Sequence, residues 1–217
     1  MYAIETVFYP LLCKKKEDTI HLKESYELLI RTSTFIAFPI LIILMSLGKP
    51  IVIILLSEKW LGSLQILKLI SIAYLFVPII YINNSFLKII NKPNVLYQSG
   101  LLKKAIGLVI LIISINYDIE YVMYGIILYN FIDSFISMII TQVLLKISVI
   151  KQLGFILNNI LLNIILLFLM NYTSSFFNNV FIEVFVSIGI GVFFYLGIPM
   201  ILKLKEFVIL KNILYQK

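Results

Sequence analysis

The chain has 217 residues, of which 61% are hydrophobic and 13% are charged, whereas soluble domains contain about 45–50% apolar and about 25% charged residues. So few polar residues cannot form the surface of a water-soluble globule, and the composition therefore excludes a soluble enzyme and a disordered tail and leaves an integral membrane protein. The formal net charge is +7, but beside long apolar segments lysine and arginine mark cytoplasmic loops, so we expect no nucleic-acid partner.

Six stretches are apolar over the length of about 20 residues that a helix needs to cross about 30 Å of hydrocarbon. Gly48-Lys49-Pro50 interrupts the first stretch. Glycine suits the end of a helix and proline the first turn of the next, so this crossing can end at Leu47 and leave 51–56 as a short half-helix. The predicted fold is an all-α, polytopic membrane helix bundle with spans at 32–56, 63–90, 97–115, 119–145, 152–172 and 180–202.

The basic residues predict how the spans are oriented. Fifteen of the 18 lysines and arginines lie in alternate segments, at residues 1–31, 88–104, 146–151 and 203–217. Because lysine and arginine accumulate on the cytoplasmic side, both termini are expected in the cytoplasm. The chain then divides into a cytoplasmic segment at 1–31, a six-span bundle at 32–203 and a cytoplasmic tail at 204–217.

The first residues do not resemble the start of a membrane protein. Residues 1–12 are apolar, but at 1.5 Å per residue they reach only about 18 Å. Three lysines follow them, whereas a secretory signal has its positive charges first. We expect these residues to be the remnant of a preceding span, with Met1 inside a longer protein. Residues 17–31 then form a polar amphipathic helix with a solvated charged face.

Asp133 stands near the centre of the fourth predicted span. An ionisable side chain there costs about 2.5–3.5 kcal/mol and normally faces a cavity or a partner. Asn130, Ser134, Ser137 and Thr141 share one helical face beside it, because their spacing follows the helical repeat. This polar face is either a cavity wall, and so part of a substrate pathway, or a hydrogen-bonded seam between helices. A carboxylate in a seam still needs a cation or a proton.

The second span carries Asn83, Asn84 and Lys88 in its cytoplasmic half, after Pro78. Proline removes a backbone hydrogen bond and bends the helix. In one interpretation the asparagines donate a hydrogen bond to the carbonyl group freed at the bend, or pack between helices. The other places both asparagines along the inner half of a hydrophilic passage, with Lys88 at its mouth.

Lys103 and Lys104 lie close to the cytoplasmic leaflet in the predicted topology. Anionic lipid headgroups attract such lysines by about 1 kcal/mol each, so both are candidates for headgroup contact. A lipid pyrophosphate would use the same positions. Membrane lipids are thus expected partners.

Catalytic chemistry has little support in the sequence. Cys13 and His21 are the single cysteine and histidine, so no disulfide framework and no metal site is expected. The sequence contains no Gly-rich phosphate loop and no Ser/His/Asp set. We therefore expect neither an enzyme nor a cofactor.

Residues 31–60 contain a span with an embedded proline, Pro39, then a short apolar stretch and the turn Ser57-Glu58-Lys59-Trp60. This order resembles a segment found just past mid-chain in bacterial polysaccharide and oligosaccharide flippases, where the turn reads Gly-Glu-x-Trp. Tyr9-Pro10 before it and Leu64–Pro93 after it are also similar to that family. The resemblance covers only the C-terminal part of such proteins.

The resemblance implies export of undecaprenyl-pyrophosphate-linked oligosaccharide units across the bacterial inner membrane for lipopolysaccharide O-antigen or surface polysaccharide synthesis. Such flippases alternate between two pseudo-symmetric lobes around a hydrophilic cavity. Two alternatives stay open. One is a multidrug or small-molecule antiporter of the same superfamily. The other is a non-transporting membrane module, either a truncated product or a partner of a separately encoded N-terminal lobe.

Overall fold

The computed structural model describes residues 19–174, 176–177 and 179–201, and every regular element in them is helical. The expected remnant of a preceding span and the cytoplasmic tail lie outside these residues. The helices are α2 (Thr19–Ser46), α3 (Gly48–Leu56), η1 (Glu58–Ser63), α4 (Leu64–Tyr74), α5 (Val77–Ile89), α6 (Pro93–Ser114), α7 (Ile119–Leu145), α8 (Val149–Ser174) and α9 (Val180–Ile201).

The described residues contain six helical segments long and apolar enough to cross a membrane. The predicted all-α membrane bundle is therefore confirmed, and the protein is embedded in a membrane. The second segment is a composite, because η1, α4 and α5 follow one another from Glu58 to Ile89. The expected short half-helix after Gly48-Lys49-Pro50 is also present, as α3.

The amphipathic helix predicted at 17–31 and the first predicted span form one helix. α2 is continuous from Thr19 through Arg31 to Ser46, so the expected boundary at 31/32 does not correspond to a break in the helix. Arg31 Nε lies 2.9 Å from Glu27 Oε1, an i,i+4 pair that supports the helix locally. Apolar residues of this half, including Tyr26 and Ile30, are fully buried. Their burial explains why the segment packs into the bundle.

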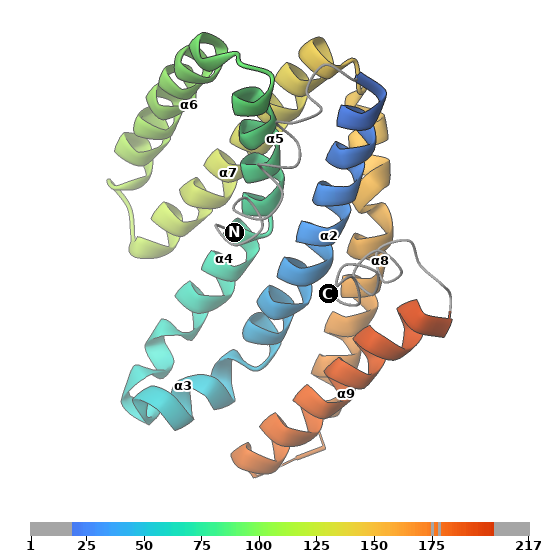
Figure 1. Ribbon diagram of the computed structural model, residues 1–217. Helices are drawn as coiled ribbons and strands as arrows, with labels where there is room; N and C mark the ends of the chain where they lie inside the picture. The colour runs from blue at the N-terminus through green and yellow to red at the C-terminus, as the bar shows by residue number, and fades with distance from the viewer. Residues whose placement is uncertain (1–18, 175, 178, 202–217) are drawn as a thin grey trace.

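The helices form a layered bundle, shown in Figure 1. α2 lies between α8 on one side and the pair α4–α5 on the other, and α7 packs against α4 and α5. α6 covers α7 at one edge of the bundle, and α9 covers α8 at the other. We call the end of the bundle at which α2 begins and α5 ends the lysine-rich end, after the loops predicted there.

Two apolar clusters hold the bundle together. The first lies toward the lysine-rich end and joins α2, α5, α7 and α8 around Tyr26, Phe86 and Phe155. The second joins α2, α8 and α9 around Phe35, Leu166 and Tyr195. Because each cluster takes residues from helices far apart in sequence, the fold depends on long-range packing between spans.

The second span bends where the sequence predicted a bend. α4 ends at Tyr74 and α5 starts at Val77, so Leu75 and Phe76 interrupt the helix just before Pro78. Proline has no backbone N–H to continue the hydrogen-bond pattern of the preceding turn. The bend therefore has the cause expected from the sequence.

Candidate substrate-pathway site

The polar face of α7 points into the bundle. Asp133, Ser134, Ser137 and Thr141 are all buried there, at between 0% and 9% relative exposure. The predicted spacing therefore identified the correct face of the helix. The contacts of this face show whether it forms a hydrogen-bonded seam between helices or the wall of a cavity.

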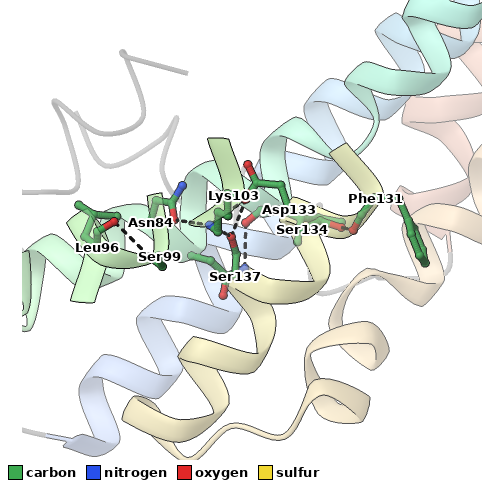
Figure 2. A network of polar contacts seen from close by, with 10 residues as sticks. Asn84, Leu96, Ser99, Lys103, Phe131, Asp133, Ser134 and Ser137 are labelled. Carbon is green, nitrogen blue, oxygen red and sulfur yellow. Dashed lines mark hydrogen bonds and ion pairs between the residues drawn. The ribbon is translucent and has the colours of Figure 1, made fainter. Parts of the chain in front are cut away.

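A lysine from α6 ends against this face. Lys103 Nζ lies 2.7 Å from Asp133 Oδ1 and donates a hydrogen bond of 2.6 Å to Ser137 Oγ. A longer contact of 3.4 Å joins Lys103 Nζ to Asn84 Oδ1 on α5. Ser137 Oγ in turn donates to Asp133 Oδ1 at 3.1 Å. Figure 2 shows Lys103 reaching across from α6 into this network.

The network satisfies every donor of the ammonium group, which has three N–H bonds and no acceptor. The charged side chains of the pair are only 5% and 12% exposed. Lys103 is the eleventh of the 22 residues of α6, and Asp133 the fifteenth of the 27 residues of α7. The ion pair thus lies in the middle of two spans, where an unpaired charge is costly.

A cleft of about 420 Å³ adjoins the same residues. α5 contributes Asn84 and Lys88 to its lining, and α7 contributes Asn130 and Asp133. Tyr81 and Ser85 also line it. Amide, hydroxyl, carboxylate and ammonium groups therefore converge on one cavity from two helices, with Lys88 in the last turn of α5.

The structure brings together most of the residues that the sequence proposed for a pathway. Asn84, Lys88, Asn130 and Asp133 line the cleft, and Ser137 adjoins it through its bond to Asp133. Ser134 does not take part, because its hydroxyl donates to the carbonyl of Phe131 in its own helix at 2.7 Å. α7 thus contributes both a seam, through Lys103, and a cavity wall.

Asn83 faces a different part of the bundle from its neighbour Asn84. It is fully buried, and its Oδ1 lies 3.1 Å from the hydroxyl of Tyr26 on α2. The same hydroxyl donates to Gln152 Oε1 on α8 at 2.7 Å. Asn83 therefore belongs to a hydrogen-bonded contact among α2, α5 and α8, which is the packing alternative for this residue.

The amide that supports the bend comes from α7. Asn130 Nδ2 donates to the carbonyl of Ala73 at 3.0 Å, next to the interruption between α4 and α5. The amide of Asn83 instead donates to the carbonyl of Ile79, one turn earlier in α5. The side-chain hydrogen bond next to the bend therefore comes from Asn130 and not from Asn83.

The prediction that Lys103 and Lys104 both contact lipid headgroups is wrong for Lys103. Lys103 is 4% exposed and paired inside the bundle. Lys104 is exposed and lines a separate groove between α6 and α7. Successive residues of a helix point about 100° apart, so one of two adjacent lysines faces the bundle while the other does not.

Sequence reasoning missed Lys103 as the partner of Asp133, although a signal for it existed. A carboxylate in mid-span needs a cation, and Lys103 and Lys104 are the cations of the adjacent span. Because both lysines were assigned to the cytoplasmic segment 88–104, neither was considered as a partner of Asp133. They lie ten and eleven residues beyond Pro93, the first residue of α6.

Residues 1–65 match a family of polysaccharide biosynthesis proteins. The match connects the chain with polysaccharide biosynthesis and includes α2 and α3, but it ends before the cleft residues. No curated protein and no solved structure gives a significant match to the chain.

In the part of the chain that the structure describes, no three His, Cys, Asp or Glu side chains gather in a way that could hold a metal ion. The lining of the cleft offers hydrogen bonds and charge. Hydroxyl groups of a sugar both donate and accept hydrogen bonds, as do the amides of Asn84 and Asn130. Binding of a polar, hydrated molecule at mid-membrane depth is the chemistry that the arrangement supports.

Proposed function

We propose that the chain is the C-terminal part of a bacterial flippase that moves undecaprenyl-pyrophosphate-linked oligosaccharide across the inner membrane. The product would serve lipopolysaccharide O-antigen or other surface polysaccharide synthesis. The family match of residues 1–65 supports the polysaccharide context. The single observation that carries the transport role is the polar cleft, with Asp133 and two asparagines in its wall.

A physical argument connects this cleft with translocation. A glycan bears many hydroxyl groups, and each loses its water hydrogen bonds on entering hydrocarbon, at a cost of several kcal/mol without a new partner. Side chains such as Asn84 and Asn130 can replace part of that hydration. The isoprenoid carrier has no such cost and can stay in lipid. The proposed role is therefore transport and not catalysis.

The proposal includes a topology and a partner. Both termini lie in the cytoplasm, so the lysine-rich end of the bundle faces the cytoplasm and Lys88 stands at the inner mouth of the cleft. A two-sided cavity needs a second lobe, and a separately encoded N-terminal lobe is the proposed partner. Membrane lipids surround the exposed apolar faces.

The test is surface polysaccharide export from cells that carry variants of the chain in its natural genetic context. We expect Asp133→Asn and Asn84→Ala to reduce export strongly while the protein stays inserted in the membrane. Ser134→Ala is the matched control, because Ser134 adjoins Asp133 but bonds only its own helix. The double variant Lys103→Met/Asp133→Asn, which restores a neutral interior, separates loss of function from loss of fold.

Other outcomes would support the remaining candidates. Normal export by folded Asp133→Asn and Asn84→Ala proteins would contradict the flippase proposal. Increased drug sensitivity of a deletion strain with unchanged surface glycan would favour the multidrug antiporter. Export that is unaffected by deletion of the gene, with no drug phenotype, would favour a non-transporting membrane module.

A further inference from the structure

Asp133 lies between a buried cation and the cleft. Its Oδ1 contacts Lys103 Nζ and Ser137 Oγ, and the same residue lines the cleft. Asn84 has the same double position, because it contacts Lys103 and also lines the cavity. Lys103 itself is 4% exposed and stands directly behind these two residues. The charge of Lys103 is therefore separated from the cleft by one layer of side chains.

The net charge of this wall depends on one proton. While Asp133 is ionised, it compensates Lys103, and an anion entering the cleft meets a carboxylate. When Asp133 binds a proton, the ammonium group loses its counter-ion at a depth where an isolated charge is costly. An anion in the cleft then supplies the missing negative charge. Anion binding and proton binding consequently favour each other.

The other charged and titratable groups around Asp133 do not supply this compensation. Lys88 and Tyr81 of α5 line the same cleft and add a positive charge at its end. Tyr129 interacts with Asp133, and with Lys104 it lines the groove between α6 and α7. Lys68 of α4 is exposed. Lys151 of α8 lines another cavity, beside Glu27.

We propose that the cleft binds an anionic group of its ligand together with one proton, which is taken from water by the Asp133 carboxylate while Lys103 keeps its charge. No covalent bond to the ligand forms or breaks. This inference rests on the proposed function for the nature of the ligand, since a lipid-linked oligosaccharide offers phosphate and, in acidic glycans, sugar carboxylates. The common feature is one compact negative charge.

Thermodynamic linkage makes the proposal measurable. If the proton increases anion affinity, the anion increases proton affinity by the same factor. Uptake of one proton with each anion gives an affinity that falls up to tenfold for each unit by which the pH rises. Probes must keep their own charge constant, which glucuronate and dimethyl phosphate do between pH 5.5 and 7.5.

The experiment uses the full 217-residue chain in detergent micelles at constant ionic strength. The increase in thermal unfolding midpoint with probe concentration gives the affinity for glucuronate, dimethyl phosphate or neutral glucose. For the wild type we expect at least tenfold tighter anion binding at pH 5.5 than at pH 7.5, and no such change for glucose. Lys104→Met is the matched control and should behave as the wild type.

Two variants locate the effect. Asp133→Asn should bind both anions with an affinity that changes less than twofold between the two pH values. Lys103→Met/Asp133→Asn, which has no buried charge, should lose anion binding altogether. Binding of one probe only would identify the sugar acid or the phosphate as the source of the charge.

Several results would overturn the inference. They are anion binding by the wild type that does not depend on pH, anion binding retained by the double variant, and the absence of any anion effect in a folded wild-type chain. A pair that only holds α6 against α7 would give the last result. These outcomes are distinct from failure of the proposed function, because export can depend on Asp133 and Asn84 in cells whose protein shows no proton-linked anion binding.

Discussion

At the scale of single residues, two adjacent lysines have opposite surroundings. Lys103 is enclosed by Asp133, Ser137 and Asn84, whereas Lys104 is exposed and borders a groove of about 290 Å³. Composition, charge count and hydropathy treat the two identically. Their different surroundings arise because only the side chain of Lys103 reaches the carboxylate of Asp133.

The ion pair should show strong coupling in stability measurements. Removing one partner of a buried pair costs about 3–5 kcal/mol, because the other charge is left uncompensated. We therefore expect Lys103→Met and Asp133→Asn each to lower the free energy of unfolding by that amount. The double variant should be much less destabilised than the sum of the two single variants.

Denaturant unfolding in mixed micelles measures this double-mutant cycle. Lys104→Met is the control and should leave the unfolding midpoint unchanged. Additive effects of the two single substitutions would contradict a direct interaction between Lys103 and Asp133.

Tyr26 is the second residue whose contacts predict a measurable effect. Its side chain is fully buried, and its hydroxyl donates to Gln152 Oε1 at 2.7 Å and lies 3.1 Å from Asn83 Oδ1. Gln152 Nε2 is already used by the carbonyls of Met138 and Ile147. Because these amides are fixed in orientation, neither can turn to replace the hydroxyl.

We expect Tyr26→Phe to destabilise the protein by about 1–3 kcal/mol, the cost of leaving buried polar atoms without a partner. Unfolding in denaturant detects the loss. Tyr97→Phe is the control, because Tyr97 is 68% exposed at the start of α6. Equal stability of the two variants would mean that the hydroxyl of Tyr26 contributes nothing to packing.

At the scale of elements, α6 is held to α7 by close approach at a glycine. A Cβ added at Gly107 would lie 2.8 Å from the ring of Tyr129 on α7, a distance that forces the ring or the helix to move. Gly100 in the same helix has nothing within 4 Å of such a Cβ. Small residues allow helices in membranes to pack closely.

Gly107→Ala should therefore lower stability by about 1–3 kcal/mol through overpacking. Gly100→Ala should be neutral, or stabilise the helix by up to about 1 kcal/mol, because alanine is the better helix former. The comparison of the two thermal unfolding midpoints is the measurement. A Gly107→Ala protein as stable as the Gly100→Ala protein would show that α6 does not pack on α7 at this position.

The contact between α8 and α9 follows the same physical rule. Ser187 and Gly191 lie one turn apart on α9, and both are buried. A Cβ at Gly191 would meet Met170 of α8 at 3.5 Å, which is ordinary van der Waals contact. The small residues thus lie on the face of α9 that packs against α8.

At the scale of the whole molecule, the sequence predicted the number of spans and not the contacts between them. Hydropathy depends on each segment alone, so the six spans could be counted from composition. The pairing of α6 with α7 through Lys103 depends on helix rotation, which hydropathy does not encode. A helix at 17–31 was predicted, but its continuity with the first span was not, because hydropathy does not show that one face of this half is buried, including Leu22 and Tyr26.

The candidate site was predictable to a similar extent. Asp133 and Asn130 were singled out because polar groups in mid-span are costly. The same argument could not separate Asn83 from Asn84, since neighbouring residues of a helix face different helices. That distinction requires knowledge of which helix lies on each side of α5.

The orientation in the membrane gives a prediction for the entire chain. With Lys103 and Lys104 inside α6, the lysine excess at the predicted cytoplasmic loops is smaller but keeps its sign. Reporter tags inserted at residues 95 and 118 should report opposite compartments, with residue 95 in the cytoplasm. The same compartment for both tags would contradict the predicted topology.

The interruption of the second span has a mechanical consequence for the cleft. Asn130 lines the cavity and at the same time holds the carbonyl of Ala73, which belongs to α4 and not to α5. A tilt of α4 about Leu75 and Phe76 would therefore pull on one wall of the cavity while α5, which supplies the facing wall, stays in place. The width of the cleft would then depend on the angle between α4 and α5, because Asn130 contacts both the cavity and α4.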